Sequence, residues 1–433
     1  MMRTSSKQIS RLLLLYGYHY GTTASFVEQS LRKIFQVCAV GVGHERCQEP
    51  GWRAGCETAT SVQEILQRLP EGFQPDAIFV MESGQKFFPS GLMEAPCPCW
   101  YYSIDPHFNG GWQQEYAKLF DRIFVSFKQY IPLFEKVGHP SVQWLPHAYD
   151  HHVYRPYPEH ERNLDIVFVG DMDPEKRPER VALLQALEQA GLKTHFTQGI
   201  WREEVAKLFS CSKLVFNQNH HGVFNPRNFE GSSCGSVVVT NMAESLTDFF
   251  TPDEDILIYE DAESLVAQVK AVLADPSRLA WLSCGAARVV EKNSWDKRME
   301  QLLNDIQQPT TPISTCFTAY EQTKADAMVF SDRELPGKAL QQLNQMEWQA
   351  HRDFEVPIFK AAIYAKYAYK EPLATVLVEL LMVESPPLSL LEPMMNLMVN
   401  LFCELKHRTG AQLLLHHYPA LKSQDKKALM DVI

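Results

Sequence analysis

The chain has 433 residues, of which 45% are hydrophobic and 21% charged, and its formal net charge is −11. This length exceeds one ordinary hydrophobic core, so we expect a soluble globular protein of two or three domains. The acidic balance argues against a protein that binds nucleic acid duplexes or anionic membranes, because both favour clustered Lys and Arg. An apolar run at 12–15 is too short for a signal sequence or a transmembrane segment, and it fits a first buried strand.

Ten cysteines are spread along the chain, and only Cys97 and Cys99 are close in sequence. No CxxC pair or histidine partner has the spacing of a zinc site, so no metal is expected. Buried free thiols suit a reducing compartment. We therefore expect a cytoplasmic protein.

Short apolar strands alternate with amphipathic helices over the first third of the chain. Strands are expected at 12–16, 37–42, 77–81, 99–104, 123–126 and 142–145, and helices at 24–35, 61–69 and 131–137. This alternation is typical of a parallel, doubly wound sheet. It predicts an α/β, Rossmann-like domain over residues 1–150.

The same pattern starts again after a linker at 146–162 that is rich in Pro, His and Tyr. Strands are expected at 165–169, 194–196, 214–217, 236–240 and 256–259, and helices at 178–190, 203–209, 262–273 and 276–292. A second Rossmann-like domain over residues 151–310 follows from this pattern. Two such domains in succession form a cleft between them.

A polar, Pro-rich segment at 307–313 precedes a region that reads as helices alone. These helices are expected at 336–353, 356–369, 372–383, 389–407 and 411–416. We predict an all-α region over residues 311–433, either a bundle or a short solenoid of tetratricopeptide type, although no clean repeat is visible. Its amphipathic helices suggest that it binds a substrate, such as a polypeptide, or mediates self-association into a homo-oligomer.

The most informative motif is FNPRNFEGSSCGSVVVT, at 224–240. Glu230 follows Arg227 by three positions, and small residues then lead to a buried-looking strand. We expect a short helix that ends at a glycine cap and continues into a parallel strand. A carboxylate there can accept hydrogen bonds from a ribose diol, and a guanidinium suits a phosphate. The pattern favours a sugar-nucleotide site.

Several further segments occur in a characteristic order. They are CWYYSIDPHF at 99–108, FDRIFVSFKQYIPLFEKVG at 120–138, VQWLPHAYDHHVYRP at 142–156, DIVFVGDMDPEKRPERVALL at 165–184, RNFEGSSCGSVVVT at 227–240, DFFTPDEDILIYEDAESL at 248–265 and NSWDKRMEQLL at 293–303. Together they resemble a glycosyltransferase of the GT-B fold and group-1 type, and in particular the spore-maturation-protein-like enzymes. The resemblance covers roughly residues 10–305 and leaves the C-terminal helices outside it.

The resemblance implies that a sugar passes from a nucleotide-diphosphate donor to an acceptor glycan or protein. UDP is a candidate nucleotide, and the base and the sugar of the donor stay open. The resemblance implies no catalytic metal or other cofactor, and it places the donor against the second domain and the acceptor against the first. The resemblance assigns ribose binding to Glu230. The other donor-binding candidates are Arg227, Gly170, Lys176, Arg177, Asn217, Asn228 and Ser232.

The stereochemical outcome of the transfer stays open. Many retaining relatives carry a second glutamate eight residues before the ribose-binding one, and here that position is Gly222. An inverting reaction needs a base for the acceptor hydroxyl, whereas a retaining reaction needs none. The candidates for this catalytic role follow strands of the first domain, and they are Asp105, His107 and Glu82.

Two other functions fit the same residues. One is a sugar-nucleotide epimerase or hydrolase on the same fold. The other is a scaffold that binds a nucleotide sugar without catalysis, which the absence of a glutamate at position 222 leaves open.

Overall fold

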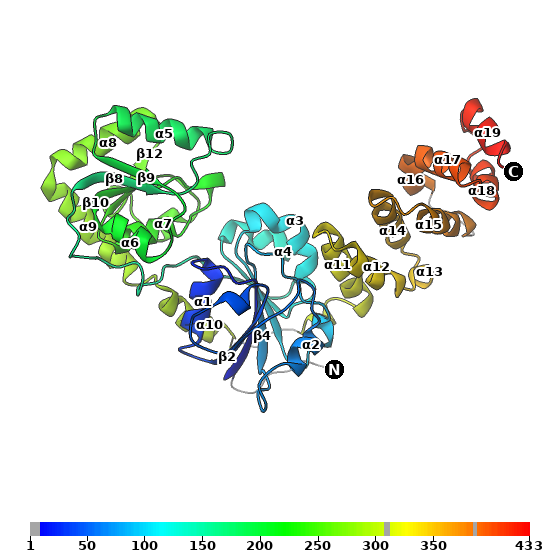
Figure 1. Ribbon diagram of the computed structural model, residues 1–433, viewed down its shortest axis with the longest axis horizontal. Helices are drawn as coiled ribbons and strands as arrows, with labels where there is room; N and C mark the ends of the chain where they lie inside the picture. Colours follow the sequence, from blue (N-terminus) through cyan, green and yellow to red (C-terminus); the bar gives the residue numbers. More distant parts are fainter. Residues whose placement is uncertain (1–8, 307–311, 384–387) are drawn as a thin grey trace. The chain divides into compact units, whose positions relative to one another are not determined.

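The computed structural model describes residues 9–306, 312–383 and 388–433 (Figure 1). The chain divides into two compact units, Met1–Cys316 and Phe317–Ile433. Among the described helices, none is both long enough and apolar enough to span a bilayer.

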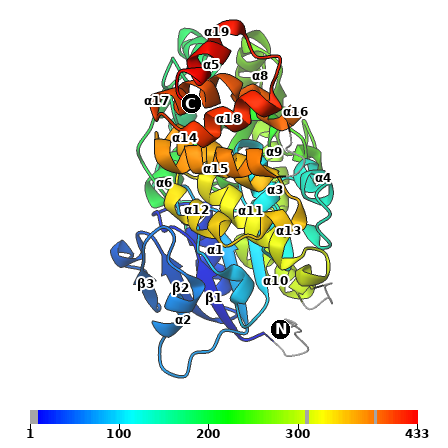
Figure 2. The ribbon, with the colours of Figure 1, turned by 90° about the vertical axis from the view of Figure 1, so that its right-hand side faces the viewer.

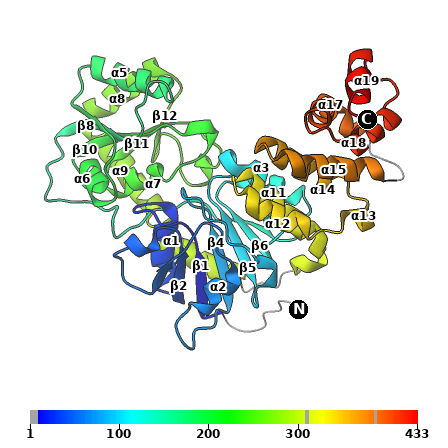
Figure 3. The ribbon, with the colours of Figure 1, turned by 45° about the vertical axis from the view of Figure 1, so that its right-hand side comes forward.

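The first unit begins with a seven-stranded parallel sheet whose strand order is β3-β2-β1-β4-β5-β6-β7 (Figure 3). Its strands are β1 (Arg11–Leu15), β2 (Gln36–Gly41), β3 (Arg53–Gly55), β4 (Ala77–Met81), β5 (Cys99–Ser103), β6 (Arg122–Val125) and β7 (Val142–Trp144). The two central strands β4 and β5 are buried along their whole length. Helices cover both faces of such a sheet, which explains the unbroken apolar runs in the sequence.

Four helices accompany this sheet, namely α1 (Thr23–Leu31), α2 (Val62–Gln67), α3 (Pro106–Ala117) and α4 (Ile131–Glu135). α2 begins with a capping box, in which Ser61 and Glu64 exchange side-chain to backbone hydrogen bonds. The sequence analysis did not anticipate α3, which starts directly at Pro106 with Asp105 at its N-cap position. That helix holds the strand end of β5 against the cleft described below.

The second sheet of this unit has five parallel strands in the order β12-β11-β10-β8-β9. They are β8 (Leu164–Val169), β9 (Thr194–Thr197), β10 (Ser212–Phe216), β11 (Val237–Asn241) and β12 (Leu257–Tyr259). The helices between and after them are α5 (Pro178–Gln189), α6 (Glu203–Ser210), α7 (Arg227–Ser233), α8 (Ala262–Ala274) and α9 (Pro276–Val290). The predicted fold class, two Rossmann-like sheets followed by a helical region, is confirmed.

One further helix, α10 (Trp295–Ile306), carries the chain back to the first sheet. Its Trp295 donates a backbone hydrogen bond to the carbonyl of Tyr149, and Asp296 forms an ion pair at 2.7 Å with Lys33, which follows α1. Buried side chains of α1, α10 and both sheets belong to a single hydrophobic cluster. The two sheets are therefore joined by a shared core as well as by the linker after β7.

The second unit contains helices α11 (Ala319–Asp332), α12 (Pro336–Asn344), α13 (Trp348–His351), α14 (Glu355–Lys366), α15 (Lys370–Met382), α16 (Leu388–Leu391), α17 (Met395–Glu404), α18 (Arg408–His417) and α19 (Ser423–Met430). The sequence analysis missed α11 and α19. Its single helices at 336–353 and 389–407 are each wrong, because shorter pieces replace them. Most of the expected linker at 307–313 lies outside the described residues.

Three helical hairpins of this unit share one turn geometry (Figure 2). Between the helices of α11–α12, α14–α15 and α17–α18 lies a residue with left-handed φ, respectively Glu334, Ala368 and Lys406. In each turn, the next backbone N–H bonds to the carbonyl of an aromatic residue five positions earlier; those residues are Phe330, Tyr364 and Phe402. The hairpins therefore repeat one turn, and the same turn ends α13, where Arg352 has the left-handed φ and the N–H of Asp353 bonds to the carbonyl of Trp348.

Candidate active site

A cleft of about 770 Å³ lies between the two sheets of the first unit. The first sheet contributes residues that follow β1, β4 and β5, and the second sheet contributes residues that follow β8, β9 and β10. The carboxyl ends of parallel strands are where ligands bind in open α/β sheets. The cleft predicted between two Rossmann-like domains is therefore present, and both domains supply its walls.

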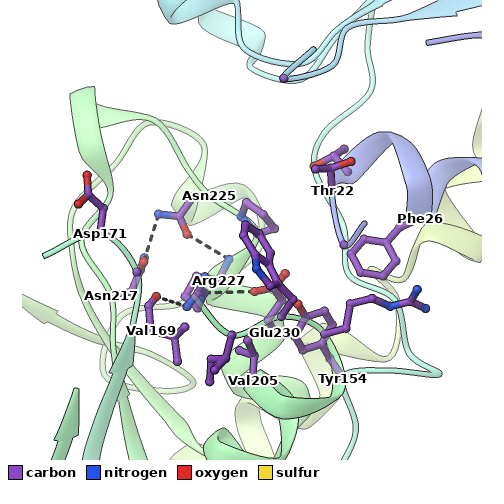
Figure 4. A pocket seen from close by; sticks show the side chains of 18 of the residues that line it. Thr22, Phe26, Tyr154, Val169, Asp171, Val205, Asn217, Asn225, Arg227 and Glu230 are labelled. Atoms are coloured by element: carbon purple, nitrogen blue, oxygen red, sulfur yellow. Dashed lines mark hydrogen bonds and ion pairs between the residues drawn. The ribbon is translucent and has the colours of Figure 1, made fainter. Parts of the chain in front are cut away.

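Glu230 and Arg227 meet on the first turn of α7, at the wall formed by the second domain (Figure 4). Arg227 Nε lies 3.2 Å from Glu230 Oε2, and a guanidinium nitrogen of Arg227 also donates to the carbonyl of Val169. The helix ends at Ser233, and Gly235, whose φ of 82° is left-handed, then leads into parallel strand β11. The expected helix, glycine cap and strand are confirmed.

Glu230 is only 8% exposed, yet it belongs to the lining of the cleft. Burial raises its pKa, while the charge of Arg227 and hydrogen bonds from Tyr154 and Arg227 oppose that rise. Tyr154 comes from the linker between the domains and is itself buried. A buried carboxylate with one cationic partner retains lone pairs that a ligand hydroxyl can use.

Asparagine side chains hold the backbone that leads into α7. Asn217 Nδ2 donates to the side-chain oxygens of Asn219 and Asn228, both at 3.1 Å. Asn225 Nδ2 donates to Asn217 Oδ1 at 3.1 Å, and Asn225 Oδ1 accepts the backbone N–H of Arg227 at 3.0 Å. Asn217 and Asn225 line the cleft, whereas Asn228 is fully buried behind them. The network fixes the start of α7 and therefore the position of Arg227.

Arg180 supplies a second guanidinium to the cleft, next to Gly170 at the end of β8. It lies over the ring of Phe168 at 5.3 Å and donates to the carbonyl of Asp171 and to Gln218 Oε1. Burial is the main cause that lowers its pKa, and the charge of Arg177 adds to the effect. A cation that is held in place and partly desolvated is well suited to an anionic ligand.

Four of the donor-binding candidates lie outside the lining of the cleft, and the first is Asn228, which is buried behind Asn217. Lys176 is 71% exposed in its side chain and pairs with Asp173 at 3.0 Å. Arg177 contacts His220 and lies 3.6 Å from Asp171. Ser232 is buried on α7. The structure thus brings Glu230, Arg227, Gly170 and Asn217 together in the cleft. From the charged stretch at 171–180, Arg180 lines the cleft, whereas the predicted Lys176 and Arg177 do not.

Asp105 and Glu82 lie at the wall formed by the first domain. Glu82 Oε2 accepts the backbone N–H groups of Ile104 and Asp105, both at 2.7 Å, and Glu82 Oε1 accepts from Asn109. Burial raises the pKa of both carboxyls, and the charge of Asp105 raises that of Glu82 further. Glu82 is committed to holding the turn between β5 and α3.

The carboxylate of Asp105, by contrast, makes no side-chain hydrogen bond to α3, although it occupies the N-cap position. Burial is the cause of its raised pKa. Asp105 is therefore the better placed of the two carboxyls to take a proton from a ligand in the cleft.

His107 is not among the residues that line the cleft. Its ring packs 4.0 Å from that of Phe108 and 6.0 Å from that of His221. Burial, with smaller contributions from His221 and His220, lowers its pKa to about 4. The imidazole is consequently neutral at physiological pH.

Within the described residues, His151, His152 and Asp296 form the one group whose ligand atoms could surround a metal ion. Lys33 Nζ already lies 2.7 Å from Asp296 and 2.8 Å from His152 Nε2. None of these residues lines the cleft. The group is an ion-pair cluster that includes Lys33 and lies where the end of α1 meets α10.

The sequence analysis missed Arg180, Asn225 and Tyr154. Arg180 lay in a charged stretch that offered three cations with no means of choosing among them. Helical spacing could have helped, since Arg180 stands in the first turn of α5, after the N-terminal Pro178. Tyr154 carried no such signal, because its role depends on the path of the linker.

Comparison with known proteins agrees with this geometry. Residues 157–304, less than half of the chain, match a family model described as glycosyl transferase-like. Alr3699/HepE of Anabaena, solved in complex with UDP-glucose, has 13% identity and a TM-score of 0.52, and the match covers 69% of this chain and 99% of that one. A glycosyltransferase from Rickettsia africae ESF-5 has 10% identity and a TM-score of 0.51, with 69% and 98% covered.

No curated protein matches the sequence. At these identities the two solved structures establish the fold alone, whereas the family match covers the domain that contains Arg227 and Glu230. The chain has the GT-B fold, and its residues 157–304 match the glycosyl transferase-like family.

Proposed function

We propose that the protein transfers a sugar from a nucleoside-diphosphate sugar, with UDP as the nucleotide, to a hydroxyl group of an acceptor. The observation that carries the proposal is the meeting of one carboxylate and two guanidinium groups in a single cleft. These groups belong to Glu230, Arg227 and Arg180. Each has a defined partner and a defined orientation before any ligand arrives.

A nucleoside diphosphate presents two features that these groups can recognise. Its ribose diol donates hydrogen bonds, and Glu230 is the buried acceptor on α7. Its diphosphate is anionic, and Arg227 and Arg180 offer the planar, permanently charged donors that phosphates bind well. The similar fold of HepE, which has been solved with UDP-glucose, supports this class of donor.

In the reaction, the bond between the anomeric carbon and the donor phosphate oxygen breaks, and a bond to the acceptor oxygen forms. The nucleoside diphosphate leaves with the bonding electrons, so Arg227 and Arg180 would stabilise its developing charge. The acceptor hydroxyl loses its proton. In an inverting transfer Asp105 would take that proton directly, whereas in a retaining transfer it would only position the acceptor.

The remaining parts of the proposal concern organisation. We propose domains at residues 1–150, 151–310 and 311–433, and a spore-maturation-protein-like specificity. The repeated turns of the second unit support a solenoid of tetratricopeptide type that contacts an acceptor or a second copy of the chain. Free thiols at all ten cysteines support a cytoplasmic location.

A thermal-shift series tests donor binding. UDP, UDP-glucose, GDP and ADP are added to the wild type, to Glu230→Gln and to Glu188→Gln, a control at an exposed glutamate of α5. We expect a uracil nucleotide to raise the Tm of the wild type and the control. We also expect its affinity for Glu230→Gln to fall by about 1.5–3 kcal/mol, because a charged acceptor is lost.

Equal stabilisation of Glu230→Gln and the control would contradict the assigned role, and no response to any nucleotide would contradict the function itself. Product analysis then separates the alternatives. Incubation of UDP-glucose without acceptor yields an epimer or free glucose if the protein is an epimerase or a hydrolase. A scaffold binds the nucleotide sugar and releases neither product.

A further inference from the structure

A second cavity of about 560 Å³ opens beside the cleft, in the first domain. Three consecutive residues with ring side chains line it, namely Tyr18, His19 and Tyr20, of which Tyr20 is 45% exposed and Tyr18 is buried. The polar residues Arg46, Gln48 and Gln85 also line the cavity. Nothing in the transfer chemistry described above uses this cavity.

The cavity lies at the same edge of the first sheet as the cleft. Its residues follow β1, β2 and β4, whereas Asp105 follows β5. In the strand order, β4 separates β1 from β5. Neighbouring strands are about 4.8 Å apart, so the ring cluster after β1 lies about 10 Å along the sheet from the strand of Asp105. That distance is comparable with the length of two linked pyranose rings.

The loop after β4 forms a common wall of the two spaces. Ser83 and Gly84 line the cleft, while Gln85 lines the cavity. Ser83 Oγ accepts the backbone N–H of Gly17 at 3.0 Å, and Gln85 Nε2 donates to the carbonyl of Tyr18 at 3.1 Å. These bonds tie the loop to the segment after β1, so both spaces are parts of one preorganised surface.

An ion pair joins the two spaces at another point. Arg202 lines the cleft and Glu49 lines the cavity, and Arg202 Nη1 lies 2.6 Å from Glu49 Oε1. The guanidinium of Arg202 also lies 4.7 Å from the ring of Tyr20. The pair holds the segment after β9 against the rim of the cavity, so donor-side and cavity-side residues are in direct contact.

The chemistry of the cavity favours a neutral saccharide. Aromatic rings suit the apolar faces of a sugar ring, and amides and phenol hydroxyls match its many hydroxyl groups. Glu49 is already paired with Arg202, and Arg46 lies 3.5 Å from Glu45, so neither charge is unbalanced. The edge strands of the sheet are β3 and β7, so no strand edge at the cavity invites an extended peptide.

We propose that this cavity binds a sugar ring of the acceptor next to the ring that reacts, so that the acceptor is an oligosaccharide chain. The inference rests on the proposed function, because it takes Asp105 and the cleft as the point of transfer. The reacting ring lies in the cleft by Asp105. The chain then passes over Ser83 and Gly84, and its next ring lies among the aromatic side chains of the cavity.

Binding to arrayed monosaccharides, disaccharides and longer neutral glycans tests the proposal, with arrayed peptides as the other arm. Gln48→Trp fills the cavity from an exposed position, and Gln67→Trp adds the same ring to an exposed position of α2. We expect the wild type and Gln67→Trp to bind at least one oligosaccharide tenfold better than its terminal monosaccharide. Gln48→Trp should lose that preference while its UDP-induced Tm shift is unchanged.

Glycan binding that Gln48→Trp leaves intact, preference for single sugars, preference for peptides, or no glycan binding would each overturn the inference. Tyr20→Ala provides a second variant at another residue that lines the cavity and should also lose the preference for longer chains. Failure of the proposed function is distinguishable, because the nucleotide-induced Tm shift would then be absent in the wild type too.

Discussion

Glu82 holds Asp105 in place, since one carboxylate oxygen of Glu82 accepts the backbone N–H of Asp105 at 2.7 Å. The same oxygen accepts the N–H of Ile104, and the other accepts from Asn109. Glu82 therefore fixes the turn, and the carboxylate of Asp105 remains available to a ligand. In the proposed inverting transfer, Glu82 would position the turn and Asp105 would take the proton.

Replacing these two residues should separate their roles. Glu82→Gln replaces a carboxylate oxygen, which accepts hydrogen bonds, with an NH₂ group, which can only donate them. We therefore expect the unfolding free energy, measured by urea denaturation, to fall by about 1–3 kcal/mol. Asp105→Asn should keep the fold and the UDP-induced Tm shift. In an inverting enzyme it should lower the transfer rate by about 10²-fold or more. Loss of stability in Asp105→Asn rather than Glu82→Gln would reverse the assignment.

The stability of Asp105→Asn relative to the wild type should depend on pH in a defined direction. Burial raises the pKa of Asp105 above its usual value of 3.8. The folded state then holds the proton more tightly, so this group lowers stability progressively as pH rises from 3.8 through the folded pKa. Asparagine removes that cost. The Tm difference, variant minus wild type, should be about 2 °C or more higher at pH 7.5 than at pH 4.5.

A constant Tm difference between the two pH values would mean that Asp105 is well solvated in the folded protein. Asp253→Asn offers a control, because that carboxylate is 70% exposed. Its Tm relative to the wild type should change little between the same two pH values.

Two cations from one charged stretch provide a matched test of donor binding. Arg180 lines the cleft, whereas Lys176 is exposed and paired with Asp173. Arg180→Gln should weaken UDP binding by about 10–100-fold, as expected for a lost charge-assisted hydrogen bond, and Lys176→Gln should not. Isothermal titration calorimetry with UDP measures both. If Lys176→Gln has the larger effect, the diphosphate lies at the outer end of this loop.

The sequence predicted the sheets well because their strands are buried on both faces. The apolar run at 77–81 coincides with β4, and each residue of that strand is buried. The residues of α3, PHFNGGWQQEYA, have no helical apolar period, so the helix that begins after Asp105 was missed. The hairpin repeat escaped detection because Glu334, Ala368 and Lys406 have dissimilar side chains in the same left-handed turn.

Within the site, the motif at 224–240 located the carboxylate and its arginine but did not explain the small residues between them and β11. A Cβ at Gly231 would lie 2.8 Å from Val238 Cγ2 and 3.2 Å from Val215 Cβ. That glycine therefore permits close packing of α7 on the sheet. Such a contact between distant segments could not be read from local sequence.

Two glycine-to-alanine changes should consequently have opposite effects. Gly231→Ala should lower the unfolding free energy by about 1–3 kcal/mol, because the added methyl group overpacks the core. Gly111 lies in α3 with open space around its missing side chain. Gly111→Ala should raise the unfolding free energy by about 0.5–1 kcal/mol through helix propensity. Urea denaturation of both variants measures the pair, and equal signs would contradict the packing of α7.

Removal of the second unit should leave the first intact. Every residue of the core that joins the two sheets precedes Cys316, and the segment that ends the first unit is anchored by Ile313, which is 2% exposed and bonds to Asp121. A chain of residues 1–316 should therefore unfold cooperatively and keep the Tm shift with UDP.

Light scattering then compares its mass with that of the full chain. If the helical hairpins mediate self-association, the full chain is larger than a monomer and the truncated chain is monomeric; if they bind an acceptor, both are monomers and only transfer declines. An unchanged mass together with an unchanged transfer rate would contradict both roles.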